Sequence, residues 1–300
     1  MSNSAVLILM PVLNEAKTLD RLISIIRGQT HRNFSLFIQD NKSQDETLVI
    51  ARHHESQDNR IQVFSNVVQI TGGENWLSMI TKVQHLDKYD YCCFQAGDDT
   101  WGDENYLSNL VNVLDGNPNA GAANPVFKIM SPMHEVLKTI EIGVVSKFAF
   151  LRVWELCRNW DNVHHIYSLY RRDIFEYLIN CKVSRFTDYS GSDWWWTYEF
   201  LNRNQSITCK DSIYFKLLEQ AEGSTFIHIK RARVLSYFHT LFNTCKSEAI
   251  HLSRARQVRS KFHLIAIPLF YFIFTIFSRV GVLHYGIIRT RLISKRKLQS

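Results

Sequence analysis

The stretch that decides the fold runs Tyr89-Asp90-Tyr91-Cys92-Cys93-Phe94-Gln95-Ala96-Gly97-Asp98-Asp99. Its apolar part predicts a buried strand, and its end places two carboxylates side by side after a glycine. Adjacent like charges repel, and a divalent cation that bridges carboxylates and a diphosphate offsets this repulsion. Gly-Asp-Asp is also an ordinary turn sequence, so a plain turn remains the alternative on this pattern alone.

The segments before this stretch alternate between strand and helix signals. Apolar runs predict strands at residues 6–10, 34–39 and 61–64, and helical spacing predicts helices along Leu19, Leu22, Ile23 and Ile26 and along Trp76, Met79, Ile80 and Val83. Repeated β-α-β units predict an α/β fold with a mostly parallel central sheet and helices on both faces.

Polar residues follow three of these strands, at Asn14-Glu15, Asp40-Asn41 and Asp98-Asp99. Ligands of parallel α/β sheets bind beyond the carboxyl ends of the strands, so these groups predict a binding site there. The segment Ser43-Gln44-Asp45-Glu46 predicts a capping box that opens the next helix. From about Pro125 the pattern is less regular, with a helix predicted at 147–158, a strand at 166–170 and a helix at 173–179.

Composition narrows the class of protein. The chain has 300 residues, of which 46% are apolar, so it can bury a large core. Its six cysteines include no Cys-x-x-Cys pair, which argues against a structural zinc site and for a reducing compartment. The first residues lead directly into a strand, so we expect no secretory signal.

Several motifs together resemble family 2 glycosyltransferases of the GT-A fold. They are Leu9-Met10-Pro11-Val12-Leu13-Asn14-Glu15, the segment 39–47, Ala96-Gly97-Asp98-Asp99, the segment 167–172 and Gly191-Ser192-Asp193-Trp194. The resemblance covers roughly residues 5 to 225 and keeps the motifs in order. It implies an inverting, metal-dependent transferase of the hexosyltransferase type that takes its sugar from a nucleotide-diphosphate donor.

The resemblance also implies roles for single residues. Pro11, Leu13 and Glu15 would lie near the base and ribose, and Asp40 would read the base unless it is a turn aspartate that caps a helix. Further donor contacts would come from Asn41, Asn66, Gly73, Asn75 and Asp98. Asp98 and Asp99 would hold Mn²⁺ or Mg²⁺, with Asp99 favoured as the metal ligand, and a UDP-sugar is the favoured donor.

Asp193 is the predicted catalytic base, with Asp188 as the alternative. In an inverting transfer one carboxylate takes the proton of the acceptor hydroxyl as that hydroxyl attacks the anomeric carbon. The tryptophans that follow, Trp194-Trp195-Trp196, would partly desolvate Asp193 or stack on a sugar. The plainer interpretation is that Asp193 caps a helix whose aromatic residues belong to the core.

Three residues depart from the pattern of the family. Leu13 stands where many members have an aromatic residue, and Ala96 stands where many have a third aspartate. Lys216 stands where an arginine is common, and it would either touch the diphosphate or be a solvated strand lysine. These departures keep a non-catalytic nucleotide-sugar-binding relative open as an alternative. A metal-dependent nucleotidyltransferase is a further alternative, although a glycine-rich phosphate loop is lacking after the first strand.

The C-terminal segment differs in charge from the rest of the chain. Residues 228–300 contain fourteen lysines and arginines and one acid, Glu248, so they carry +13, which leaves −6 of the total +7 for residues 1–227. A short apolar run at 264–277 with basic flanks suits a helix lying on an anionic membrane, dipping into it, or packing on the enzyme. We expect no nucleic-acid partner.

These observations predict two domains and a location. Residues 1–227 would form a GT-A glycosyltransferase domain, with 1–124 as the nucleotide-sugar-binding half and 125–227 as the acceptor half. Residues 228–300 would be a helical, basic and apolar tail that associates with the membrane. The expected enzyme transfers sugar to a glycan or lipid-linked acceptor in cell-surface polysaccharide synthesis, on the cytoplasmic face of the cell membrane.

Overall fold

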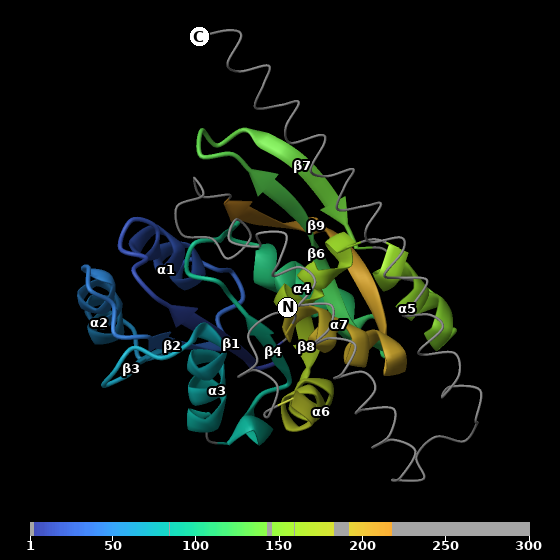
Figure 1. Cartoon of the computed structure of the whole chain (residues 1–300), viewed down its shortest axis with the longest axis horizontal. Coiled ribbons are helices and arrows are strands. Elements are labelled where there is room, and N and C mark those ends of the chain that lie inside the picture. The colour runs from blue at the N-terminus through green and yellow to red at the C-terminus, as the bar shows by residue number, and fades with distance from the viewer. Residues whose placement is uncertain (1–2, 84, 143–145, 159, 183–191, 218–300) are drawn as a thin grey trace, which may run out of the picture. The chain divides into compact units, whose positions relative to one another are not determined.

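The first four strands build the parallel half of one sheet (Figure 1). They are β1 (Val6–Val12), β2 (Phe34–Asp40), β3 (Ile61–Ser65) and β4 (Tyr91–Phe94), in the order β3-β2-β1-β4 with every pair parallel. The computed structural model describes residues 3–83, 85–142, 146–158, 160–182 and 192–217. Asp188 and the predicted tail, residues 228–300, lie outside these ranges.

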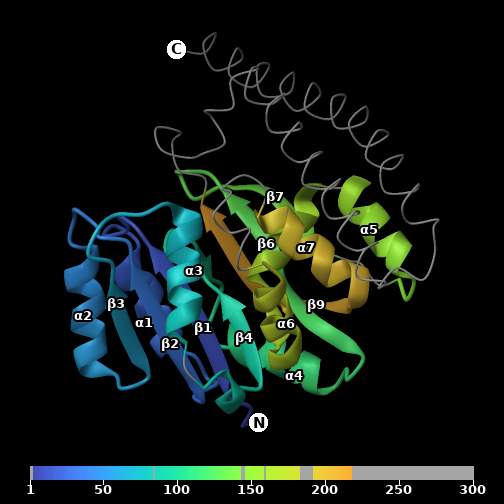
Figure 2. The ribbon, with the colours of Figure 1, turned by 60° about the horizontal axis from the view of Figure 1, so that its bottom comes forward.

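The helices of this half follow the predicted stripes. They are α1 (Leu19–Arg27), α2 (Thr47–Gln57) and α3 (Gly72–Lys82). Helix α1 buries all four residues of its stripe and ends at Gly28, as the spacing predicts. In Figure 2, α3 and α6 lie in front of the sheet and α1 lies behind it, so helices cover both faces.

The second half of the sheet is mixed. Its elements are β5 (Thr100–Trp101), α4 (Tyr106–Asp115), β6 (Ala120–Met130), β7 (Val136–Glu141), α5 (Ala149–Arg158), β8 (Leu169–Arg171), α6 (Arg172–Lys182), α7 (Ser192–Arg203) and β9 (Gln205–Leu217). The strand order continues from β4 through β8, β6 and β9 to β5, and β7 pairs with β6. The β6–β9 pair is parallel, and the other pairs of this half are antiparallel.

The predicted α/β fold is therefore confirmed, and its parallel pattern is complete only in the first four strands. The predicted strand at 166–170 is wrong in its first part, because residues Trp160–Tyr167 form a 3₁₀ helix and the strand covers Leu169–Arg171. Among the helices of the described ranges, none has both the length and the apolar character that crossing a membrane requires.

Aromatic side chains join the two halves in one core. The ring centroid of Phe94 lies 4.3 Å from that of Trp76, 5.0 Å from that of Phe175 and 5.3 Å from that of Trp196. Trp196 is fully buried, so this member of the tryptophan run belongs to the core. Such pairs add about 0.5–1.5 kcal/mol each beyond the area that they bury.

Candidate active site

The carboxyl ends of β1, β2 and β4 bring the predicted polar residues to one edge of the sheet. Val12 pairs with Asp40, and the N–H of Asn41 donates to the carbonyl of Val12 at 2.9 Å. On the other side of β1, the N–H of Gln95 donates to the carbonyl of Leu9 at 2.9 Å. The loops that carry Leu13, Asn41 and Asp98 therefore start next to one another.

The loop after β1 is fastened to the segment that precedes α2. Asn14 has a left-handed backbone with a φ of 57°, which asparagine tolerates better than most residues. Its N–H donates to the hydroxyl of Ser43 at 2.9 Å, and its side-chain oxygen accepts from the N–H of Gln44 at 2.8 Å. The N–H of Glu15 donates to the hydroxyl of Thr47 at 2.7 Å. These bonds fix the backbone on which Pro11, Leu13 and Glu15 stand.

This arrangement corrects one prediction. Helix α2 begins at Thr47, and its N-cap residue Glu46 makes no side-chain capping bond. Ser43 does not cap the helix, because its hydroxyl accepts the N–H of Asn14 on the neighbouring loop. The described capping box is at α3 instead, where the hydroxyl of Thr71 accepts the N–H of Glu74 and the Glu74 carboxylate accepts the N–H of Thr71.

Asp40 is buried at the end of β2. Its carboxylate accepts the N–H of Ser43 at 3.2 Å and the hydroxyl of Ser65 at 2.9 Å. These are the contacts of a turn aspartate, and they also hold the carboxylate in one orientation. Its role as the reader of the donor base stays a prediction.

Four amide side chains form a network between β2, the loop after β3 and α3. The side-chain NH₂ of Asn66 donates to the side-chain oxygens of Asn41 at 2.9 Å and Asn75 at 2.7 Å. The side-chain NH₂ of Gln39 donates to the side-chain oxygen of Asn66 at 2.9 Å, and Asn41 donates to the carbonyl of Ile70 at 2.7 Å. The structure thus brings the predicted donor residues of this segment together, in contact with one another, with buried Gly73 in the first turn of α3.

Gly97 lets the paired aspartates approach the loop after β1. A Cβ at Gly97 would lie 2.9 Å from Cγ1 of Val12 and 3.0 Å from Cγ of Glu15, closer than carbon atoms pack. The hydroxyl of Thr18 donates to the carbonyl of Gly97 at 3.0 Å. A larger residue at this position would therefore have to displace the side chain of Val12 or Glu15 where the chain turns into Asp98.

The two aspartates have different surroundings. Asp98 is half-buried, and no hydrogen bond joins its side chain to the described residues. The Asp99 side chain is fully enclosed, and its Oδ2 accepts from the hydroxyl of Tyr214 at 3.0 Å and from Nζ of Lys216 at 3.3 Å. Its Oδ1 accepts the N–H of Leu217 at 3.2 Å.

The pKa values follow from this enclosure. Burial raises the pKa of the Asp99 carboxyl to about 6, although the ammonium of Lys216 and the hydroxyl of Tyr214 act against the shift and Asp98 adds to it. Burial alone would lower the pKa of Lys216, but the Asp99 carboxylate outweighs it and raises that pKa above its usual value. Lys216 is therefore a charged partner of Asp99, and 25% of its side chain is exposed.

Tyr167 covers this ion pair. Its ring stacks on that of Tyr214 with centroids 5.3 Å apart, and Nζ of Lys216 lies 4.9 Å from the centroid of the Tyr167 ring. A cation over an aromatic face is stabilised by the ring quadrupole. The two tyrosines and the lysine therefore form one packed cluster around Asp99.

Asp193 stands exposed in the first turn of α7. Its backbone carbonyl accepts the hydroxyl of Thr197 at 2.8 Å. Burial raises the pKa of the Tyr167 hydroxyl, and the carboxylates of Asp99, Asp193 and Asp98 add to this rise. The three predicted functional acids, which come from distant parts of the chain, thus act electrostatically on one tyrosine.

Sequence reasoning named Tyr167 only as part of the motif at 167–172, and it assigned no role to Tyr167 or to Tyr214. Tyr214 and Lys216 are two residues apart on β9, so their side chains share one face of the strand. That spacing is visible in the sequence. The contact of these residues with Asp99 cannot be read from the sequence, because Asp99 lies more than one hundred residues earlier.

The two paired aspartates would hold a divalent cation at this edge, and they differ in how many hydrogen-bond donors already contact them. Among the described residues, no group of three or more histidine, cysteine, aspartate or glutamate side chains is arranged to hold a metal ion. A cation that arrives with a diphosphate needs only one or two carboxylates, because phosphate oxygens and water complete its coordination. The side-chain oxygens of Asp98 accept no hydrogen bond from the described residues, whereas Oδ2 of Asp99 accepts two and Oδ1 accepts one.

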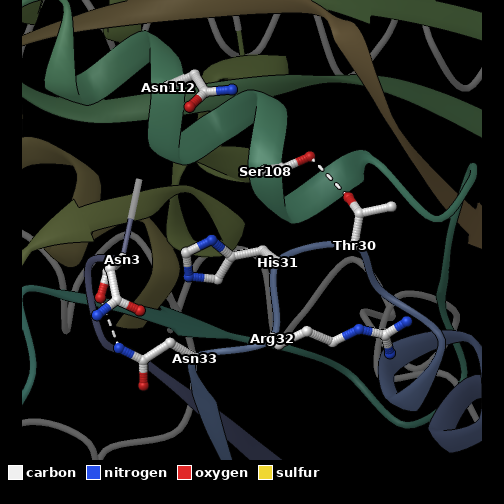
Figure 3. A pocket seen from close by; sticks show the side chains of 7 residues that line it. All are labelled: Asn3, Thr30, His31, Arg32, Asn33, Ser108 and Asn112. Atoms are coloured by element: carbon white, nitrogen blue, oxygen red, sulfur yellow. Dashed lines mark hydrogen bonds between the residues drawn. The ribbon is translucent and has the colours of Figure 1, made fainter. Parts of the chain in front are cut away.

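A cavity of about 230 Å³ lies at the other edge of the sheet (Figure 3). It is lined by Asn3, Thr30, His31, Arg32, Asn33, Ser108 and Asn112. Asn3 and Asn33 precede β1 and β2, so the cavity is at the amino ends of these strands. Ligands of such sheets bind at the carboxyl ends, and the cavity is therefore separate from the candidate active site.

The sequence model of the family described as Glycosyl transferase family 2 matches residues 7–179, more than half of the chain. No curated protein matches the chain in sequence.

Solved structures share the fold at low identity. The S. aureus TarS 1-349 structure in complex with UDP-GlcNAc has a TM-score of 0.58 and 15% identity, over 83% of this chain and 66% of that one. The mannosyltransferase PcManGT from Pyrobaculum calidifontis, in complex with GDP-Man and Mn²⁺, has a TM-score of 0.51 and 12% identity, over 87% of this chain and 66% of that one. The match to TarS 1-349 without a named ligand covers 60% of that chain, so this chain spans less than two thirds of these structures.

Proposed function

The chain belongs to glycosyl transferase family 2, and we propose that it is an inverting glycosyltransferase that uses a nucleotide-diphosphate sugar. The acceptor in this proposal is a glycan or a lipid-linked glycan of the cell surface. The observation that carries the proposal is the Asp98-Asp99 turn at the carboxyl edge of the sheet, packed through Gly97 against Glu15. The exposed acid Asp193 lies within electrostatic reach of the same cluster.

The donor is proposed to lie across the loops of the first half. Pro11, Leu13 and Glu15 contact the base and ribose, and Asp40 accepts an N–H of the base. The amide network of Asn41, Asn66 and Asn75, with Gly73, shapes the wall beside them. A UDP-sugar is the favoured donor, because TarS is described with UDP and with UDP-GlcNAc, while PcManGT with GDP-Man makes a GDP-sugar the competing choice.

The chemistry requires a base on one side of the sugar and charge stabilisation on the other. Asp193 accepts the proton of the acceptor hydroxyl while that hydroxyl attacks the anomeric carbon. The Asp98-Asp99 turn would hold Mn²⁺ or Mg²⁺, and such a cation would neutralise the charge on the leaving diphosphate. The complex of PcManGT with Mn²⁺ supports a divalent cation in this role.

Turnover of nucleotide sugars by the full-length chain tests the proposal. UDP- and GDP-sugars are incubated with the protein and Mn²⁺, and the release of nucleoside diphosphate is measured. We expect one donor class to be hydrolysed slowly without acceptor and to lose this activity in Asp193→Asn. Tight UDP or GDP binding without turnover of any donor would favour the non-catalytic relative instead.

We further propose that residues 228–300 bring the enzyme to the cytoplasmic face of the cell membrane. Their +13 charge supports this, because each lysine or arginine near an anionic surface contributes about 1 kcal/mol. Full-length protein should sediment with anionic vesicles at low salt, less so at high salt, and weakly with neutral vesicles. Protein that stays in the supernatant with anionic vesicles at low salt would disprove the membrane role.

A further inference from the structure

We infer that the cavity at the amino edge of the sheet is a second binding site, which holds one neutral, hydroxyl-rich sugar ring. Its volume of about 230 Å³ is below the roughly 300–1,000 Å³ of pockets for drug-sized ligands, so it suits a ligand of the size of a monosaccharide. The inference of a sugar site rests on the residues of the cavity. Only the source of the sugar, a glycan that the enzyme extends, rests on the proposed function.

Hydrogen bonds fix the two walls of the cavity against each other. The loop between α1 and β2 forms one wall, and the first turns of α4 form the other. The N–H of Thr30 donates to the carbonyl of Glu104 at 2.8 Å, and the side-chain oxygen of Gln29 accepts the N–H of Leu107 at 2.9 Å. The hydroxyls of Thr30 and Ser108 are hydrogen-bonded to each other at 3.1 Å. The site is therefore preformed, and a ligand does not have to order it.

The imidazole of His31 presents an unused nitrogen to this cavity. His31 is only 6% exposed, and its Nε2 donates to the carbonyl of Ser4 at 2.8 Å, since a carbonyl can only accept. In the neutral ring Nδ1 is then an acceptor, and it has no hydrogen-bond partner among the described residues. In Figure 3 the ring extends from its loop towards the space between Asn3 and Asn112. An enclosed acceptor of this kind requires a donor, such as a hydroxyl of a ligand or a water molecule.

Two amide side chains add donors and acceptors around the same space. The side chains of Asn3 and Asn112 are exposed, and they make no hydrogen bond with the described residues. Each amide offers both a donor and an acceptor, which matches a pair of neighbouring hydroxyls on a sugar ring. Together with Nδ1 of His31, these amides can bind one ligand from several sides.

The charge of the lining argues against an ion as the ligand. None of the lining residues is acidic, so the cavity offers no carboxylate to a metal ion. Arg32 is the one arginine or lysine of the lining, and its Nη1 donates to the carbonyl of Arg27 at 3.0 Å. Figure 3 shows its guanidinium group on the side away from His31. An anion would therefore meet no converging cations, whereas neutral hydroxyls meet acceptors and donors.

Binding of free monosaccharides to the full-length chain tests the inference. The neutral probes are glucose, galactose and N-acetylglucosamine, the anionic probes are glucuronic acid and a glucose phosphate, and binding is measured by saturation-transfer NMR and calorimetry. We expect at least one neutral sugar to bind with a millimolar Kd, with or without saturating UDP, and the anionic probes to bind more weakly. Failure of every neutral sugar to bind would leave water as the occupant and overturn the inference, and so would tighter binding of the anionic probes.

Substitutions in the cavity locate the binding site. His31→Phe removes the acceptor Nδ1 and Asn112→Leu removes an exposed amide, and each should weaken the binding of the neutral sugar by about fivefold or more. Asn119→Leu is the matched control, because Asn119 is an exposed asparagine just after α4 and outside the lining, and it should leave the Kd unchanged. Equal affinity in the unaltered protein and in the cavity variants would contradict the inference. If His31→Phe does not fold, Asn112→Leu alone decides, since its residue is exposed.

Hydrolysis of the donor measures the proposed function separately. Both cavity variants should hydrolyse the donor at the rate of the unaltered protein, because their residues lie at the edge of the sheet opposite to the acidic turn. Sugar binding in the cavity without hydrolysis of any donor would support this inference and refute the proposed function. Hydrolysis without sugar binding would support the proposed function and refute this inference.

Discussion

The two halves of the sheet hold their polar groups in different ways. In the parallel half, the loops at the carboxyl edge are joined mainly by amides, hydroxyls and backbone groups, as in the network of Gln39, Asn41, Asn66 and Asn75. In the mixed half, ionisable side chains are buried on the strands and on the segments next to them. Lys216 has a carboxylate partner there. Among the described residues, neither ring nitrogen of His165 has a hydrogen-bond partner.

This difference has a thermodynamic consequence. A neutral amide loses little on burial when its hydrogen bonds are satisfied. An ionisable group must find an opposite charge or stay neutral, so its contribution to stability depends on pH. We therefore expect the parallel half to bind the donor on a frame held mainly by neutral amides, with Asp40 as its buried carboxylate, and the mixed half to supply the base and most of the sensitivity to pH.

The largest expected effect concerns Asp193 and separates binding from chemistry. Asp193→Asn should lower turnover by about 10²-fold or more, because the general base is lost, and should leave UDP affinity nearly unchanged. Steady-state kinetics and calorimetry measure the two quantities. Asp173→Asn is the matched control, since Asp173 is also an exposed acid in the first turn of a helix of the mixed half. Near-normal turnover of Asp193→Asn would move the role of the base to Asp188.

A smaller effect should appear in the stability of the protein when the pH is lowered, because the side chain of His165 is buried. Burial lowers the pKa of His165 to about 3, so the folded protein keeps this ring neutral while the unfolded chain protonates it below about pH 6.5. Stability should therefore fall as pH drops, by about 2 kcal/mol between pH 6.5 and pH 5 from this residue. Urea unfolding at both pH values measures the loss.

The matching variants locate this effect in the mixed half. His165→Leu should reduce the difference in unfolding free energy between the two pH values. Part of the difference should remain, because desolvation lowers the pKa of the half-buried His164 to about 4. His53→Gln changes an exposed histidine of the parallel half and should leave the difference unchanged. An equal loss in the unaltered protein and in His165→Leu would contradict this explanation.

The smallest expected effect concerns the frame of the parallel half. Thr71→Ala removes the hydroxyl of the capping box at α3 and should lower the free energy of unfolding by about 1 kcal/mol. Thr81→Ala is the control, because Thr81 lies exposed near the other end of α3. The loss should be the same at pH 6.5 and pH 5, in contrast to that of His165, and a pH-dependent loss would break the comparison.

The parallel half was the more predictable from sequence. Its signals are local, as in the stripe Leu19, Leu22, Ile23 and Ile26, and the rule for parallel sheets places the ends of neighbouring strands together. The capping box predicted at Ser43 does not form, because the hydroxyl of Ser43 accepts the N–H of Asn14 on another loop. A local sequence pattern does not include that contact.

The mixed half could be predicted only in outline. Antiparallel and parallel pairs alternate there, and the strand at Leu169–Arg171 is too short to give a periodic signal. The Asp99–Lys216 pair joins residues 117 positions apart, so no local pattern indicates it. The predicted site residues were named from motifs, but the division between an open Asp98 and an enclosed Asp99 depends on contacts that only the fold creates.

The bond between Leu217 and Asp99 has a mechanical meaning. Leu217 is the last residue of β9, and its N–H donates to the Asp99 carboxylate at 3.2 Å. The end of β9 is therefore fastened directly to the acidic turn. A displacement of Leu217 would change the hydrogen bond to Asp99, so the end of this strand and the acidic turn are mechanically coupled.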